Sequence, residues 1–314
     1  MVLPKNKLKA VMIGHAVGDA LGVPVEFCTR EELDQSPVRD MLGFGSHPVP
    51  AGAWSDDTSM SLAALDSLAS GKVDFDEIMD NFVRWCWESE YTPTGETFDV
   101  GRTCLTAIRN YVSTNGLSPL ECGGTDEYSN GNGSLMRIHP FVLYAYAKKM
   151  PTEDCIALVH SASALTHGHE RSKIACGIYA FALLNLLKEP SKASLLDGLK
   201  QAKSYYQNYG ELQHYSRLFE SDFYQPQRED IKSSGYVIDT LEATLWCVLT
   251  TADYESAVIK AVNLGEDTDT VAAVAGGLAG ALYGYDAIPK KWLDTLIRRE
   301  YIEQLCDKAH NIWQ

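Results

Sequence analysis

Two acidic motifs, Ser-Asp-Asp-Thr at 55–58 and Asp-Thr-Asp-Thr at 267–270, carry side chains suited to metal chemistry. Each motif stands directly before an apolar stretch, so each is expected at the N-terminus of a buried helix. Helix capping and the helix dipole explain one acidic residue in each motif more readily than two. Oxygen-only clusters suit hard cations such as Mg²⁺ or Mn²⁺, whereas zinc prefers His or Cys. The two motifs therefore predict two halves of a binuclear site, with acidic capping as the alternative.

Two further carboxylates lie near the N-terminus. Asp19 occupies a run with small residues at every second position from 14 to 22, which allows helix backbones to approach closely. We expect Asp19 to be either a hydrogen-bonded core carboxylate or a partner of a metal ligand. Glu26 follows Pro24 and so lies beyond the end of this helix. It is expected either to face a cleft or to be a solvated loop residue.

Two other segments have the composition of ligand-binding loops. The glycine-rich stretch 130–137 combines backbone N–H groups, a hydroxyl and an arginine at an expected helix start, which suits a diphosphate. A plain turn followed by a helix cap is the alternative. His167 and His169 flank a glycine between two expected helices, at a spacing that is wrong for a metal pair on one helical face. Ring stacking or hydrogen bonding is therefore the expectation there.

A loop at 88–99 combines carboxylates with aromatic rings, which together can stack on and pair with a planar cation. The side chains concerned are Trp87, Glu88, Glu90, Tyr91 and Asp99. We expect this loop to select a guanidino group over a serine hydroxyl. The alternative is a solvated acidic loop with Phe98 packed inward.

Five motifs in order give the chain a resemblance to ADP-ribosylglycohydrolases of the dinitrogenase reductase-activating type. They are Gly-Asp-x-Leu-Gly with the downstream Glu26, Ser-Asp-Asp-Thr at 55–58, Gly-Asn-Gly-Ser-Leu-Met-Arg at 131–137, Thr-His-Gly at 166–168 and Asp-Thr-Asp-Thr at 267–270. The resemblance spans nearly the whole chain. It implies an all-α fold and hydrolysis of the glycosidic bond that links ADP-ribose to a protein side chain or a small molecule.

The resemblance also implies roles for individual residues. Two Mg²⁺ or Mn²⁺ ions would be held by Ser55, Asp56, Asp57, Asp267, Asp269 and Thr270. The expected catalytic residues are Glu26, Asp56, Asp57 and Asp269, with Glu26 mobile between the metal and the attacking water. The expected substrate-binding residues are Asp99, Gly131, Asn132, Gly133, Ser134, Arg137 and His167. Carboxylates and a metal-held water suit this reaction, because breaking a ribosyl bond develops oxocarbenium character.

An arginine-type acceptor is the expected substrate, so that the enzyme would reverse mono-ADP-ribosylation. Serine-linked or small-molecule ADP-ribosyl compounds are the alternative substrates. A binuclear phosphohydrolase would use the same carboxylates, and a non-catalytic ADP-ribose-binding or structural relative would retain them without turnover. The intact acidic motifs disfavour that last alternative.

Composition places the chain among ordinary globular proteins, with 314 residues, 45% hydrophobic and 22% charged. We expect one domain over residues 1–314, because no stretch has the length or charge of a linker. A net charge of −15 makes bulk nucleic acid and anionic membranes unfavourable partners. The eight cysteines form no CxxC pair, and His15 and Asp19 interrupt the first apolar stretch. These features predict a reduced, cytoplasmic protein.

Helical periodicity dominates the sequence, and no alternating segment of strand length competes with it. It predicts helices at about 5–22, 58–70, 74–90, 101–115, 134–149, 152–166, 170–188, 191–208, 236–251, 253–264, 269–284 and 289–312. Each such helix has an apolar face to bury, and the connections are short. The expected fold is therefore an all-α, single-domain bundle of many helices, of the ADP-ribosylglycohydrolase type.

Overall fold

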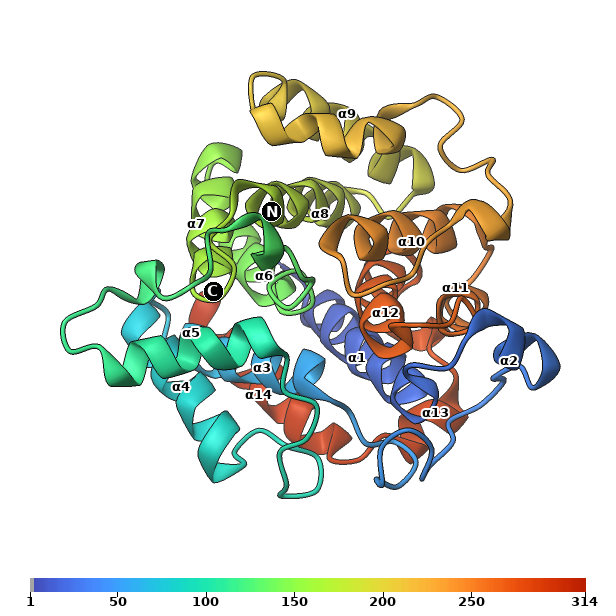
Figure 1. The fold of residues 1–314 in the computed structure, drawn as a ribbon, viewed down its shortest axis with the longest axis horizontal. Coiled ribbons are helices and arrows are strands. Elements are labelled where there is room, and N and C mark those ends of the chain that lie inside the picture. The colour runs from blue at the N-terminus through green and yellow to red at the C-terminus, as the bar shows by residue number, and fades with distance from the viewer. Residues whose placement is uncertain (1–2) are drawn as a thin grey trace.

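Helices supply the regular structure of residues 3–314, the part of the chain that the computed structural model describes (Figure 1). Within these residues there is no strand, and only two isolated bridges occur, from Gly124 to His167 and from Gly131 to Tyr236. The all-α prediction is confirmed. The α-helices are α1 (Lys5–Gly22), α2 (Arg30–Gln35), α3 (Asp56–Leu68), α4 (Phe75–Glu88), α5 (Arg102–Ser113), α6 (His139–Ala147), α7 (Thr152–Ala164), α8 (Glu170–Lys188), α9 (Lys192–Tyr206), α10 (Val237–Thr250), α11 (Tyr254–Val262), α12 (Thr268–Tyr283), α13 (Lys290–Thr295) and α14 (Arg299–Trp313).

Six 3₁₀ segments lie in the connections between the α-helices of the described residues. They are η1 (Val23–Val25), η2 (Pro119–Glu121), η3 (Glu127–Ser129), η4 (Gly210–Phe219), η5 (Arg228–Asp230) and η6 (Tyr285–Ala287). The first of these follows α1 directly, because Pro24 cannot continue the α-helical hydrogen bonding. Glu26 therefore leaves the helix axis, as the sequence predicted.

The central pair of helices, α1 and α12, pack with their backbones in contact (Figure 1). A Cβ atom added to Gly18 would lie 2.1 Å from the Ala272 carbonyl oxygen, and one added to Gly276 would lie 2.2 Å from the Gly14 carbonyl oxygen. Side chains at these glycines would force the helices apart. The small residues thus let the end of α1 reach the start of α12, where the Thr268 hydroxyl donates to the Gly22 carbonyl at 2.8 Å.

The other helices surround this pair and bury it. α8, α10 and α11 cover α12, while α3 and α14 cover α1. α9 lies at the outer edge against α8 (Figure 1). The arrangement brings the start of α3 beside the end of α1, so that both acidic motifs begin helices at the same end of the central pair.

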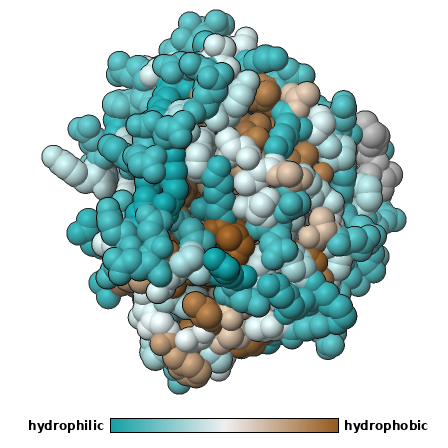
Figure 2. Space-filling model, turned by 90° about the vertical axis from the view of Figure 1, so that its right-hand side faces the viewer, coloured by the Kyte–Doolittle hydropathy of each residue, from teal (hydrophilic) through white to brown (hydrophobic). Residues whose placement is uncertain are grey.

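Helix α1 is long and apolar enough, by length and composition, to be a candidate membrane span. In this fold, however, 89% of its apolar window is buried against other helices. That burial is what the core helix of a globular protein shows. The face of the molecule in Figure 2 is mostly hydrophilic, and its hydrophobic residues lie in small separate patches.

The α-helices differ from the predicted ones by more than two residues in three places. The helix predicted from 134 begins at His139, because the glycine-rich segment before it forms turns. The helix predicted over 289–312 is two helices, divided near Arg298, whose φ of 53° is left-handed. Helix α2 was not predicted; it spans six residues and depends on a capping box between Thr29 and Glu32 rather than on apolar periodicity.

Candidate active site

A cavity of about 200 Å³ lies where the starts of α3 and α12 meet. Its walls come from six separate parts of the chain, which the fold brings together. The lining residues are Glu26, Asp56, Asp99, Gly101, Arg102, Thr103, Cys104, Gly131, Asn132, Gly133, Met136, His167, Asp267 and Thr270. The predicted motifs therefore converge on one cavity.

Asp19 supports the first acidic motif from the neighbouring helix α1. One of its oxygens accepts the Ser55 backbone N–H at 2.8 Å, and the other accepts the Thr58 N–H at 3.0 Å and the Thr58 hydroxyl at 2.6 Å. Asp19 is thus the hydrogen-bonded core carboxylate that was one of its two expected roles. The Ser55 hydroxyl caps the same helix by accepting from the Asp57 N–H. Helix capping therefore does not require the carboxylates of Asp56 and Asp57.

Asp57 connects the two acidic motifs. Its Oδ2 atom accepts the Ser55 hydroxyl at 3.2 Å and, from the other motif, the Thr270 hydroxyl at 3.2 Å. Nearby, the side-chain amide of Asn132 donates to Asp267 Oδ2 at 2.9 Å. The glycine-rich segment, α3 and α12 thereby form one continuous polar cluster.

Several oxygens of this cluster lack any partner. Within residues 3–314, Asp57 Oδ1, Asp267 Oδ1 and Asp269 Oδ2 are buried and accept no hydrogen bond. Burial, together with the neighbouring carboxylates, raises the pKa of Asp56, Asp57 and Asp269 well above its usual range. A bound cation would reverse this effect, because it satisfies the free oxygens and favours the ionised form. An oxygen-only ligand set of this kind suits a hard divalent cation.

Glu26 lies in the cavity wall and is 6% exposed, so it is not a solvated loop residue. Burial raises its pKa to about 7, and Asp99 and Asp267 add to the rise, although the hydrogen bond with His47 opposes it. Oε2 of Glu26 lies 2.5 Å from Nε2 of His47. That contact is the main reason that the pKa of His47 is raised.

His47 is a site residue that the sequence analysis did not identify. Its ring nitrogen and oxygens of Glu26 and Asp99 all lie within 4.8 Å of one another. The only signal in the sequence is its position in a segment rich in glycine and proline at 42–53, which also contains ordinary turn residues. The partners that give His47 its place come from other parts of the chain.

The glycine-rich segment lines the cavity with Gly131, Asn132 and Gly133, which were predicted to bind substrate, and with Met136. At Gly133 a Cβ atom would lie 2.8 Å from Cys104 Sγ and 3.0 Å from His167 Cε1, so a side chain there would collide with the cavity wall. His167 lines the cavity, is 1% exposed and bonds through Nδ1 to the Thr166 hydroxyl at 2.8 Å. Desolvation lowers its pKa to about 3, so its ring is neutral at physiological pH. Gly131, Asn132, Gly133 and His167 are thus brought together.

Ser134 and Arg137 are not brought to the cavity, which corrects the expectation that they bind substrate. Arg137 is fully buried and donates to the Ala162 carbonyl at 3.2 Å and to the Thr166 hydroxyl at 2.6 Å. Its guanidinium also lies 4.8 Å from the centre of the Phe82 ring. Ser134 is buried and accepts the Ser163 hydroxyl at 2.9 Å. Both residues make hydrogen bonds within the core, and neither is placed to bind a diphosphate in the cavity.

The acidic loop at 88–99 reaches the cavity at Asp99 alone. Tyr91 is 5% exposed and donates its hydroxyl to Asp66 at 3.0 Å, away from the cavity lining. Glu88 and Glu90 are exposed and do not line the cavity. Phe98 packs inward against a small apolar cluster, which was the alternative prediction. Asp99 is therefore the residue of this loop that lies in the cavity lining, where it can pair with a guanidinium.

The geometry suits chemistry in which positive charge develops. Four carboxylates from separate parts of the chain line the cavity together with a neutral His167, and Arg102 is the one permanently cationic side chain among the described lining residues. Such a surface stabilises an oxocarbenium-like transition state and can orient a water molecule for attack on it. These are the requirements for cleaving a glycosidic bond.

Comparison with known proteins agrees with this chemistry. The family model for ADP-ribosylglycohydrolase matches residues 2–314. ADP-ribosylarginine hydrolase Tri1 of Serratia proteamaculans (strain 568) is 35% identical over 305 residues, which are 96% of this chain and 78% of that protein. ADP-ribosyl-[dinitrogen reductase] glycohydrolase of Rhodospirillum rubrum is 34% identical over 309 residues, which are 96% of this chain and 94% of that protein.

The fold is also similar to a solved structure. An ADP-ribosylglycohydrolase-related protein complex contains a chain that superposes with a TM-score of 0.83 at 34% sequence identity. The match covers 99% of both chains. The similarity in sequence and in architecture therefore extends over nearly the whole chain.

Proposed function

This chain belongs to the ADP-ribosylglycohydrolase family, and from that premise we propose that it hydrolyses ADP-ribosylated arginine with the help of two divalent cations. The observation that carries the proposal is the convergence of both acidic motifs on one cavity through Asp57 and Thr270. Hydrolysis of an ADP-ribosyl bond is the activity of the family. The arginine acceptor and the two cations are the proposed refinements.

The cation site would consist of the six oxygen-bearing residues of the two motifs. These are Ser55, Asp56, Asp57, Asp267, Asp269 and Thr270. Support comes from the buried, unpartnered oxygens of Asp57, Asp267 and Asp269, which need either protons or cations. When bound, Mg²⁺ or Mn²⁺ would supply Lewis acidity that orients the ribose hydroxyls and the attacking water.

Glu26 is proposed as the group that moves the proton. Water attacks the anomeric carbon of the ribose while the bond from this carbon to the guanidino nitrogen breaks. The Glu26 carboxylate accepts a proton from the water, and the leaving guanidine gains that proton to become a guanidinium ion. A Glu26 pKa of about 7 suits a group that must both accept and release a proton near neutral pH.

Asp99 supports arginine as the acceptor. It is the member of the acidic loop that lines the cavity, and a carboxylate there can pair with the planar guanidinium of a modified arginine. A serine acceptor would leave no cation for it to bind. The name of the Serratia relative, an ADP-ribosylarginine hydrolase, supports the same choice.

The proposal is tested by presenting the purified protein with two substrates, one protein ADP-ribosylated on arginine and another on serine. Release of free ADP-ribose is measured with Mg²⁺ or Mn²⁺ present. We expect kcat/KM to be higher for the arginine-linked substrate. A preference for the serine-linked substrate would overturn the acceptor, and no release from either would overturn the proposed reaction.

A further inference from the structure

Glu26 and His47 face each other across a short contact that is shielded from water. Nε2 of His47 lies 2.5 Å from Oε2 of Glu26, and the two side chains are 14% and 8% exposed. A hydrogen bond between a carboxylate and an imidazole is charge-assisted, and it strengthens where water is excluded. Within residues 3–314, this is the hydrogen bond that the Glu26 carboxylate makes.

The main chain around Glu26 is already fixed by its neighbours. On one side, the Ser46 N–H donates to the Pro24 carbonyl at 2.9 Å and the Ser46 hydroxyl donates to the Glu26 carbonyl at 2.5 Å. A Cβ atom on Gly45 would lie only 1.8 Å from the Pro24 carbonyl oxygen, which shows how closely the loop at 43–47 packs on this segment.

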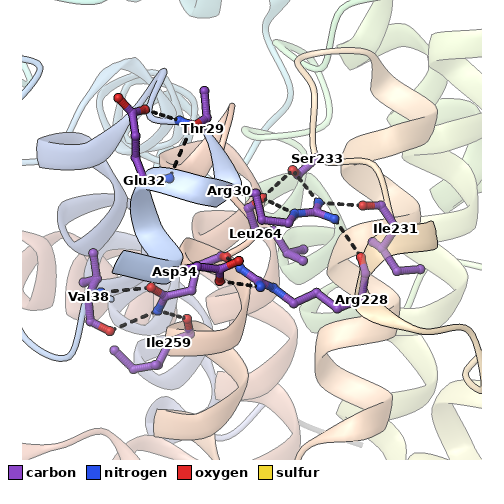
Figure 3. Close-up of polar contacts among 11 residues, drawn as sticks. Thr29, Arg30, Glu32, Asp34, Val38, Arg228, Ile231, Ser233, Ile259 and Leu264 are labelled. Atoms are coloured by element: carbon purple, nitrogen blue, oxygen red, sulfur yellow. Dashed lines mark hydrogen bonds and ion pairs between the residues drawn. The ribbon is translucent and has the colours of Figure 1, made fainter. Parts of the chain in front are cut away.

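On the other side, the segment after Glu26 is tied to the turn that precedes Asp267. The Phe27 N–H donates to the Glu266 carbonyl at 2.7 Å, and the Glu266 N–H donates to the Cys28 carbonyl at 2.8 Å. Next, the guanidinium of Arg30 spans the gap between α2 and the 228–233 loop (Figure 3).

The Arg30 contacts extend this support to Leu264, before the turn, and to the separate 228–233 loop. Its Nε donates to the Leu264 carbonyl at 2.9 Å, and Nη2 donates to the Ile231 carbonyl at 2.7 Å (Figure 3). The backbone of Glu26 is therefore fixed from two directions. These main-chain contacts do not restrict rotation of the Glu26 side chain, which is held by His47.

The ring of His47 is itself held in place. Its centre lies 5.2 Å from that of Phe98 and 6.1 Å from that of Phe27, and both rings are tilted against it. Phe98 comes directly before Asp99, so the loop that supplies the proposed acceptor contact also packs against His47. Aromatic contacts of this kind restrict the imidazole at little entropic cost.

We infer that His47 is a positioning residue for the proposed hydrolysis, because it holds Oε2 of Glu26 and leaves Oε1 to accept the proton of the attacking water. The inference rests on the proposed function and adds to it a residue outside the acidic motifs. His47 acts through Glu26 and does not contact the reacting atoms. Replacing it should leave the cavity intact while Glu26 samples other rotamers.

The test compares three variants in the full-length protein with an arginine-ADP-ribosylated substrate and Mg²⁺. His47→Ala removes the donor, and we expect kcat to fall about tenfold to a hundredfold, with KM changed less than about threefold. His47→Gln keeps an N–H donor on a side chain of similar reach, and it should recover most of the lost kcat. His310→Ala, in α14 beside Leu3, is the control and should match the wild type.

Two kinetic results would overturn the inference. One is a His47→Ala variant with kcat within twofold of the wild type, and the other is equal loss in the Ala and Gln variants. Unchanged metal affinity and thermal midpoint in His47→Ala would separate positioning from a general structural defect. A fall in metal affinity or in the thermal midpoint that is large enough to explain the loss of turnover would contradict a positioning role for His47.

The proposed function can fail independently of this inference. If the wild type releases no ADP-ribose, crystal structures of the wild type and of both His47 variants decide the inference alone. We expect the Glu26 carboxylate in its present place in the wild type and in His47→Gln, and displaced in His47→Ala. An unmoved Glu26 in His47→Ala would overturn it.

Discussion

The hydroxyl of Thr270 donates to Asp57 across 3.2 Å, which joins the start of α12 to the start of α3. The two residues are far apart in the chain, and the close packing of α1 against α12 brings them together. The contact places the Asp57 carboxylate of the first motif within hydrogen-bonding distance of the second motif. A cation bound by either motif would therefore change the electrostatic environment of both motifs.

Glu26→Gln is expected to lower kcat by about 10²–10⁴-fold, because it removes the proposed proton acceptor without changing the size of the side chain. In the wild type, kcat should rise with pH through about 7 as Glu26 loses its proton. The measurement is a pH profile of turnover for both proteins. Glu31→Gln, an exposed carboxylate in α2, is the control. Near-normal turnover in Glu26→Gln would assign the proton transfer to another group.

Asp99→Asn is expected to reduce kcat/KM on the arginine-linked substrate by about tenfold or more, because it removes the carboxylate available to pair with the guanidinium. Any residual activity on a serine-linked substrate should change less. Glu90→Gln, an exposed residue of the same loop, serves as the matched control. Equal loss on both substrates would show that Asp99 does not select the acceptor.

Arg137→Met is expected to lower the free energy of unfolding by about 1.5–3 kcal/mol, because buried hydrogen bonds from a charged donor are lost. KM should stay close to the wild-type value, since Arg137 does not line the cavity. Urea denaturation and steady-state kinetics give both quantities. A large rise in KM with unchanged stability would restore the diphosphate role that the structure contradicts.

Buried histidines make a pH-dependent contribution to stability, because their rings are kept neutral in the folded state. Desolvation lowers the pKa of His15 and His160 to about 4, against 6.5 for an ordinary histidine. Between these values the unfolded chain binds more protons at these two histidines than the folded chain does, so their contribution to the free energy of unfolding falls as pH decreases from about 6.5 toward 4. The raised pKa values of Glu26, Asp56 and Asp57 act in the opposite direction. Urea midpoints of the wild type and of a histidine variant, measured with chelator across this range, isolate the histidine contribution.

His160→Gln isolates one of these histidines, because His160 lies outside the cavity and bonds to the Tyr206 hydroxyl. The stability of the wild type relative to this variant should fall as pH decreases over the same interval. An equal slope in the two proteins would mean that His160 titrates normally in the fold.

The parts of the site that could be predicted are those encoded within a single segment. Asp56 and Asp57 are adjacent and precede an apolar run, so both their proximity and their place at a helix start follow from local rules. The small residues in α1 and α12 likewise indicate close helix packing, and Gly18 against Ala272 confirms it.

What could not be predicted depends on contacts between distant segments. Arg137 stands beside a glycine-rich loop, as a ligand-binding arginine would, but its partners Ala162 and Thr166 lie in and after α7 and turn it into the core. His47 has no local motif, and its role follows only from Glu26 and Phe98 being packed against it. In both cases the sequence gives the chemical type of the side chain, but it does not show toward which part of the fold the side chain points.

Turnover is expected to depend on one cation site formed jointly by the two acidic motifs. The most direct measurement is calorimetric titration of Mn²⁺ into chelator-treated protein, combined with ADP-ribose release from an arginine-linked substrate before and after metal is restored. Asp269→Asn tests the site, and Asp66→Asn, the partly exposed acid of α3, is its control.

For the wild type and Asp66→Asn, we expect two bound ions, loss of turnover after chelation and its recovery with Mg²⁺ or Mn²⁺. Asp269→Asn should bind metal more weakly and lose about a hundredfold or more in turnover while remaining folded. Full turnover by exhaustively chelated wild type, or unaltered metal binding in Asp269→Asn, would contradict the account.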